Sequence, residues 1–244
     1  MMYKIKQLVA KYLLMAFFIW TSIIGLSFYF NFYFQKKETI NVVEKIARES
    51  FNKDQAYRIW ASSHGGVYVP LTTHTPPSPW LSHIKDRDII STDGKKLTLM
   101  DPTYILKEMM SDYSNLYGIK GRIFGIKFLN PNNRATPQEE KLIKRFEQGE
   151  KEISEFIGTA DEESFFLARP MIMRQECQKC HAHLGFKNGS VRGSVSVSMS
   201  MLPYRNIESY HINSIAATHA ITWLFGFLTL LFTAKRIRKA LFEK

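Results

Sequence analysis

Two long runs without a charged residue frame the chain. The first extends from Tyr12 to Phe34 and the second from Ile212 to Ala234, and both are rich in apolar residues. About 20 consecutive apolar residues cross the hydrocarbon core of a bilayer as a helix. The pattern therefore predicts transmembrane helices at 12–34 and 212–234, with residues 35–211 as a domain between them.

A cleaved signal peptide is the alternative for the first run. The apolar part of such a peptide is shorter and ends at small residues. This run instead ends in Asn31-Phe32-Tyr33-Phe34, so we expect an uncleaved anchor.

Basic residues gather outside both runs. The formal net charge is +11, and the two ends, residues 1–11 and 235–244, account for +7 of it. Because positive charge flanking a span marks the cytoplasmic side, we expect both termini in the cytoplasm and residues 35–211 in the periplasm, outside a bacterial inner membrane. Lys36 and Lys37 oppose this rule but are outnumbered. The rest of the chain has no basic stripe with interleaved aromatics, so we expect no nucleic-acid partner.

The first half of the intervening domain alternates between helical and extended patterns. Apolar residues recur at helical spacing over 37–60, and this helix either packs on its own domain or pairs with its copy in a homodimer. Residues 67–79 are rich in proline and expected to be extended. Residues 86–99 predict a hairpin that turns at Asp93-Gly94. Asp101 predicts the N-cap of a helix over 102–117.

Three strands and one more helix complete the predicted domain. The strands lie at 120–129, 164–173 and 191–201, and the last alternates apolar residues with Ser, as in a strand with one buried and one wet face. Thr136-Pro137-Gln138-Glu139 predicts a capping box at the start of the helix. Its inward residues are expected to be Leu142, Ile143, Phe146, Ile153 and Phe156. This order of elements indicates a mixed α+β domain.

Both cysteines of the chain lie in the motif Cys177-Gln178-Lys179-Cys180-His181. Two thiols at this spacing reach the two vinyl groups of a porphyrin, and the next histidine then lies under the ring as an iron ligand. We therefore predict one covalent c-type haem, held by Cys177 and Cys180, with His181 as the proximal ligand. Such haem is attached outside the cytoplasmic membrane in bacteria, in agreement with the predicted topology.

Other interpretations of the motif fit less well. A thioredoxin-like redox pair opens a helix in a βαβ unit, which no pattern here predicts. Zinc would use Cys177, Cys180, His181 and His183, but structural zinc sites usually separate their ligand pairs, whereas Cys180 and His181 are adjacent. A disulfide across so short a loop would constrain little.

Several motifs occur here in the same order as in a known family. They are His64-Gly65-Gly66-Val67-Tyr68-Val69-Pro70, Thr75-Pro76-Pro77, Asn130-Pro131-Asn132-Asn133, the haem motif and Gly193-x-Val195-x-Val197. Over about residues 37–204 the chain resembles the single-haem, PAS-like periplasmic sensor domains that precede bacterial chemoreceptor, histidine kinase and diguanylate cyclase modules. The resemblance implies a PAS-like fold, a haem at Cys177, Cys180 and His181, a dimer, and sensing of redox state or a small gas.

The chain continues past the second run only to Lys244, where relatives carry an output module. We therefore expect a membrane-anchored haem sensor that signals to a separate partner protein. The alternative is a membrane-tethered electron carrier or a cytochrome subunit of a larger redox complex. The sequence has no phosphate-binding glycine loop, Gly-x-Ser-x-Gly or His-Glu-x-x-His motif, so an enzyme is not expected.

The sixth iron ligand separates these two functions. Relatives have a methionine where this chain has Ile105, and Met109 or Met110 in the same predicted helix are the favoured distal ligands, with His64 as the alternative. Further thioethers are Met171, Met173 and Met199. A labile distal ligand would let CO or NO bind, as suits a sensor, whereas a fixed ligand suits an electron carrier.

Three further residues are candidates by position. Arg169 and Arg192 flank the haem motif, either as partners of haem propionates or as solvated surface arginines. His219 lies inside the second apolar run, where ionisable side chains are candidate functional residues. A second, b-type haem there would need a partner imidazole, and the first run contains no histidine. The alternative is a tolerated histidine near the outer surface of the membrane.

Overall fold

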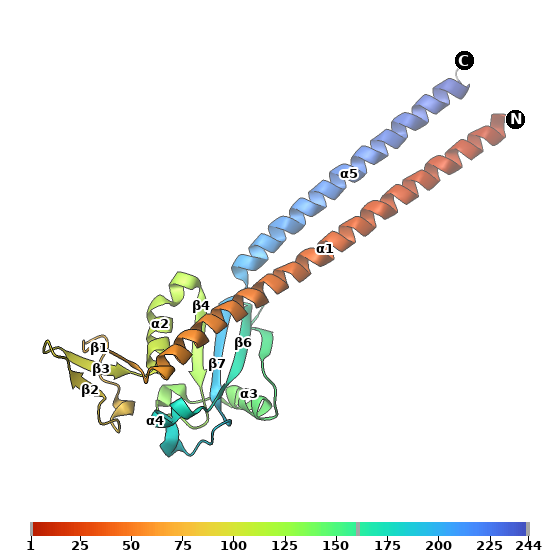
Figure 1. Ribbon diagram of the computed structural model, residues 1–244. Coiled ribbons are helices and arrows are strands. Elements are labelled where there is room, and N and C mark those ends of the chain that lie inside the picture. Colours follow the sequence, from red (N-terminus) through yellow and green to blue (C-terminus); the bar gives the residue numbers. More distant parts are fainter. Residues whose placement is uncertain (1, 160–161, 243–244) are drawn as a thin grey trace. The chain divides into compact units, whose positions relative to one another are not determined.

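The computed structural model describes residues 2–159 and 162–242, without the side chains of residues 2, 117, 176, 179, 180, 182, 241 and 242. The chain divides into two compact units, Met1–Val42 with Pro203–Lys244, and Val43–Leu202. The protein is mixed α+β, as the sequence predicts, with two antiparallel sheets and two long helices (Figure 1).

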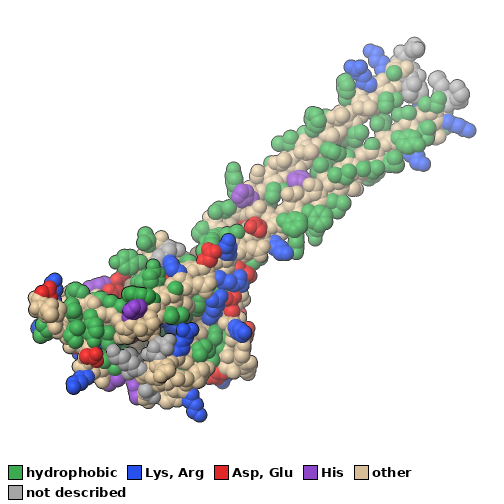
Figure 2. Space-filling model, in the orientation of Figure 1, with side chains coloured by type: hydrophobic (Ala, Val, Ile, Leu, Met, Phe, Trp, Pro, Cys, Tyr) green, Lys and Arg blue, Asp and Glu red, His purple; other side chains and the backbone are tan. Residues whose placement is uncertain are grey.

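The first unit is a pair of helices, the N-terminal part of α1 (Met2–Ser63) and α5 (Leu202–Phe242). Each helix contains a stretch long and apolar enough to cross a membrane, and neither stretch is buried within the protein. Hydrophobic side chains cover both helices in Figure 2. The two predicted spans lie inside these helices, while their exact boundaries at 12–34 and 212–234 stay predictions.

The two helices of this unit run antiparallel. Trp20 Nε1 donates a hydrogen bond to the Trp223 carbonyl at 3.2 Å, and Trp223 Nε1 donates to Thr21 Oγ1 at 3.1 Å. A Cβ on Gly226 would lie 2.3 Å from the Trp20 ring, so the absence of a side chain there allows close approach. Small residues and interhelical hydrogen bonds are what hold helices together in lipid.

His219 is part of the same contact between the two helices. Its Nδ1 donates to the Ile215 carbonyl at 2.7 Å, and its Nε2 lies within hydrogen-bond distance of Ser27 Oγ, at 3.1 Å. Both ring nitrogens therefore have partners within the helix pair. This is a structural role, rather than ligation of a second haem.

The second unit is built on a four-stranded antiparallel sheet in the order β4 (Ile119–Phe124), β7 (Val191–Ser200), β6 (Ser164–Ile172), β5 (Ile153–Ile157). A three-stranded sheet has the order β1 (Val67–Pro70), β3 (Lys96–Met100), β2 (Asp88–Ile90). The helices α2 (Pro102–Tyr117) and α3 (Pro137–Glu147) and the short 3-10 turns η1 (Pro79–Leu81) and η2 (Pro131–Asn133) connect the strands.

The predicted helix caps, hairpin turn and first helix of the domain are confirmed. Asp101 Oδ1 accepts from the amides of Thr103 and Tyr104 at 2.7 and 3.1 Å, which caps α2. Thr136 and Glu139 form the predicted capping box at the start of α3. The predicted hairpin turns between β2 and β3 with Gly94 at φ 80°, a conformation that favours glycine. The helix predicted at 37–60 is part of α1.

The helix predicted to carry Ile153 and Phe156 ends earlier, at Glu147. Gly149 adopts φ 101°, and Ile153–Ile157 then forms β5, which pairs with β6. Ile153 still faces the core, but Phe156 is 39% exposed. The prediction was wrong because a short pattern such as Ile153 and Phe156 is compatible with a helix or with a strand. The pairing with β6, which decides between them, cannot be recognised from this segment alone. The strand predicted at 120–129 also ends early, at Phe124.

The predicted wet face of the last strand is correct only at its end, where Ser198 is half-buried and Ser200 is exposed. Ser194 and Ser196 are buried, because β7 lies in the middle of the sheet and α3 covers this face (Figure 1). The two serines lie opposite Phe124 and Ala168, two core residues of the same face. Each hydroxyl donates to a backbone carbonyl of a neighbouring strand, at 2.9 Å for Ser194 and 3.5 Å for Ser196. These hydrogen bonds lower the cost of burying a polar side chain.

Candidate haem site

The Cys-x-x-Cys-His motif lies in the connection between the two central strands, β6 and β7. It forms three short turns in succession, η3 (Gln175–Cys177), α4 (Gln178–His181) and η4 (Ala182–Leu184). Backbone hydrogen bonds between Met173 and Ser190 and between Gly189 and Met173, both 2.9 Å, close the base of this connection. The motif is therefore held at the end of the central strands. The side chain of Cys180 lies outside the described part of the structure, and Cys177 is half-buried.

His181 presents an unprotonated nitrogen to its surroundings. Arg192 Nη1 donates a hydrogen bond to His181 Nε2 at 3.1 Å, and an arginine has no acceptor, so Nε2 must hold a free lone pair. Burial lowers the pKa of His181 to about 3, with Arg192 as the next cause. The imidazole is therefore neutral, the form that binds iron.

Two hollows meet at this histidine. The larger has a volume of about 430 Å³ and is lined by the segment before β2, by α2, and by residues that follow β4. The smaller, about 270 Å³, is lined by Cys177, by the C-terminal part of α1 and by the end of β6. Asp101, Thr103, His181 and Arg192 line both. The larger volume lies in the range of cofactor and ligand pockets.

The smaller hollow has a basic wall made by Arg58, Arg169, Arg174 and Arg192. Burial lowers the pKa of Arg58 to about 10, and the positive charge of Arg192 lowers it further. Asp101 is the carboxylate in this wall, and burial raises the pKa of that group. Arg169 pairs with Glu152 and donates to Asn52 Oδ1 at 2.7 Å. Of the two arginines that flank the motif, Arg192 therefore faces His181, whereas Arg169 already has a carboxylate partner.

The predicted distal ligands lie in different surroundings. Met110 is buried against β4, where a Cβ on Gly121 would lie 2.1 Å from its sulfur, and it lines a separate hollow of about 220 Å³. The His64 ring packs against Trp60 at 4.7 Å between centroids. Among the described methionines, Met171 is the one that lines the same hollow as His181. The choice of Met109 or Met110 stays a prediction.

The zinc alternative has no assembled site among the described side chains, which exclude Cys180. Cys177, His181 and His183 do not form a group of close ligand atoms. His183 instead packs its ring against His83, at 4.9 Å between centroids.

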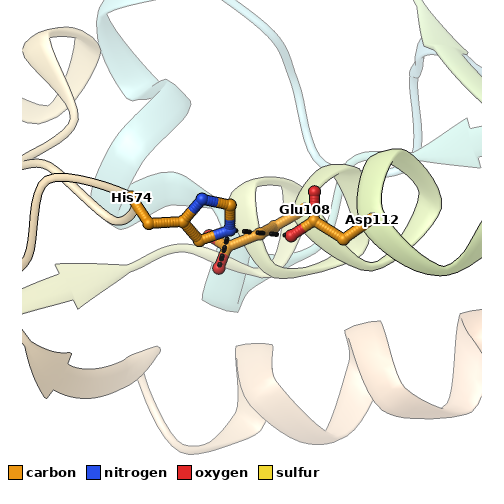
Figure 3. Close-up of side chains that lie close together, drawn as sticks. All are labelled: His74, Glu108 and Asp112. Carbon is orange, nitrogen blue, oxygen red and sulfur yellow. Dashed lines mark hydrogen bonds and ion pairs between the residues drawn. The ribbon is translucent and has the colours of Figure 1, made fainter.

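An acidic cluster that the sequence did not reveal borders the larger hollow. His74 Nε2 lies 2.8 Å from Asp112 Oδ2 and 3.8 Å from Glu108 Oε1, as Figure 3 shows. Thr75 Oγ1 also donates to Glu108, at 3.1 Å. The hydrogen bond that His74 donates to the Asp112 carboxylate raises the pKa of His74. The four-residue spacing of the two acids on α2 was the available signal, but the third member comes from a distant loop.

Comparison with known proteins gives a matching family model and similar solved structures, one of which is described here. The cyanobacterial heme-protein Tll0287 is 14% identical, with 66% of this chain and 95% of that chain covered and a TM-score of 0.42. The comparison with curated proteins found no match. The model of the Tll0287-like family matches residues 35–200, which include the haem motif and both sheets. The chain therefore belongs to the Tll0287-like family.

Proposed function

We propose that this protein is a membrane-anchored c-type haem protein whose PAS-like periplasmic domain senses redox state or a small gas and signals to a separate partner. Cys177 and Cys180 would hold the haem by thioether bonds, and His181 would bind the iron. The bound haem supplies an iron that changes oxidation state and accepts small ligands. We expect no enzymatic reaction.

The observation that carries this proposal is the state of His181. Its Nε2 accepts a hydrogen bond from Arg192 where two hollows meet, so a lone pair is available beside a space for a cofactor. Membership of the Tll0287-like family supports the same cofactor, since the related structure is described as a heme-protein. The thiol of Cys177 lines one of these hollows. The residues present therefore fit a c-type haem.

The residues around the motif have three roles in this proposal. The closed base of the β6–β7 connection keeps the cysteines and His181 in one place. Phe124 and Met171 give the larger hollow apolar walls, which limit the access of water. If Nε2 of His181 bound iron, it would no longer accept from Arg192, and the Nη1 donor of Arg192 would face another acceptor in the same hollow.

The antiparallel helix pair supports the proposed topology. An even number of spans leaves both chain ends on one side, and basic residues at both ends favour the cytoplasm. The haem motif would then lie in the periplasm. A reporter active only in the cytoplasm, fused after Lys244, should be active, and the same fusion at Lys95 in the β2–β3 hairpin should be silent. The reverse pattern would overturn this orientation.

Visible spectra of the purified full-length protein test the function. We expect covalent haem, and prompt spectral changes when CO or NO is added to the reduced form, because a sensor needs an exchangeable iron site. The double variant Cys177→Ser/Cys180→Ser is the control for unattached haem. If the iron is six-coordinate and low-spin in both oxidation states and indifferent to both gases, the electron carrier is the better assignment.

A further inference from the structure

Arg58 is a buried cation whose neighbours do not neutralise it. Its Nη1 lies 2.5 Å from Met171 Sδ, and a thioether is only a weak acceptor. No carboxylate of the described residues lies within ion-pair distance of its guanidinium. Removing a charged group from water without a partner of opposite charge is costly. The site therefore favours a ligand that brings negative charge.

The surroundings of Arg58 increase this cost. Arg174 and Arg192 line the same hollow, and both act to lower the pKa of Arg58. The carboxylate that lines this wall is Asp101, which also caps α2 through its Oδ1. Arg169, in β6, is already paired with Glu152, the residue before β5. Among the described side chains, four arginines and one carboxylate, that of Asp101, line this space together with the thiol of Cys177.

We propose that Arg58 binds a propionate carboxylate of the haem, with Arg192 as a second donor once His181 Nε2 is occupied. The proposal rests on the haem assignment above. Guanidinium and carboxylate form paired, charge-assisted hydrogen bonds, and a haem carries two such carboxylates. The protein would thus convert an unfavourable buried charge into a contact that exists only in the haem-loaded form. It is a positioning role, because Arg58 acts on the edge of the cofactor and not on the iron.

Haem-loaded full-length protein with Arg58→Gln tests this inference. We expect a lower midpoint potential than in the wild type, because a nearby cation disfavours the ferric state, which carries one more positive charge. The propionate bending band in resonance Raman spectra should also shift, which a general loss of stability would not cause. Arg58→Lys should restore part of both changes, since it keeps the charge and loses the paired geometry.

Arg145→Gln is the matched control. It removes one positive charge from the same domain, but Arg145 is on the surface and pairs with Glu150. Both readouts should then equal those of the wild type. If Arg58→Gln folds with an unchanged potential and propionate band, the inference is wrong; if it fails to fold, an unchanged band in Arg58→Lys decides against it. Haem staining on a denaturing gel tests the haem assignment separately, because thioether bonds do not depend on Arg58.

Discussion

Arg192 donates a hydrogen bond to Nε2 of His181 at 3.1 Å, so a cation touches the nitrogen that would bind iron. The two residues come from neighbouring segments, α4 and the start of β7. Their contact fixes which ring nitrogen is unprotonated. Burial is the first cause of the lowered pKa of His181, and the charge of Arg192 is the second, so the imidazole is neutral.

Replacing both cysteines should abolish covalent haem. In Cys177→Ser/Cys180→Ser neither thioether bond can form, so haem staining after denaturation should disappear. Single variants should retain weakened staining through the remaining bond. Persistent staining of the double variant, or a wild-type protein that contains zinc and no haem, would contradict the site.

Met171 should affect the iron spectrum more than Met110 does. Met171 lines the hollow of His181, whereas Met110 packs on Gly121 beside a separate hollow. Leucine conserves volume, so Met171→Leu should change the reduced spectrum while costing less than about 1.5 kcal/mol of stability. Met109→Leu and Met110→Leu are measured alongside. A change in either of these, with Met171→Leu silent, would instead support the ligand predicted from the sequence.

The pairing of α1 and α5 should depend on Gly226. A side chain there meets the Trp20 ring, so Gly226→Val should destabilise the helix pair by about 1–3 kcal/mol through overpacking. Gly25→Val is the control, because a Cβ at Gly25 meets nothing within 4 Å. Thermal unfolding in detergent should show a lower Tm for the first variant only. Equal Tm values would argue against this packing.

Acid should destabilise the haem-free protein through His181. Burial lowers the native pKa to about 3 from an ordinary value of 6.5, so between these values the unfolded chain binds a proton that the native state does not. As the pH is lowered through this window, the free energy of unfolding should fall by up to about 1.4 kcal/mol per pH unit. In the Cys177→Ser/Cys180→Ser background, His181→Gln should have the flatter profile. Parallel profiles would mean that His181 titrates normally.

His74 should stabilise its loop below neutral pH and lose that effect in alkali. The hydrogen bond to Asp112 raises the pKa of His74 above its usual 6.5. Its contribution is therefore complete below about pH 6.5 and is lost as the pH rises through the raised value. Hydrogen exchange of residues 71–79 should accelerate between pH 6 and pH 9, after correction for intrinsic rates. Asp112→Asn should remove most of this dependence, and an unaltered dependence would refute the role of the pair.

Short-range patterns in the sequence determined the helix caps, the two apolar helices and the candidate haem motif. Asp101 caps α2, and Thr136 with Glu139 caps α3, because each group reaches amides only two or three residues away. The two apolar runs are helical for a similar reason, since a helix satisfies its own backbone groups. The haem motif is also local, because its chemistry depends on the spacing of Cys177, Cys180 and His181.

Only the tertiary structure decided which side chains are buried, which segments pair as strands and which residues line the same hollow, because these depend on partners distant in the chain. Ser194 and Ser196 are buried because α3 covers their face, and Ile153 is in a strand because β6 is available to pair with it. Arg58 and His181 line one hollow although 123 positions separate them. Burial and electrostatics act through space, so an alternating or basic pattern along the chain does not reveal which face is covered or which charge is left without a partner.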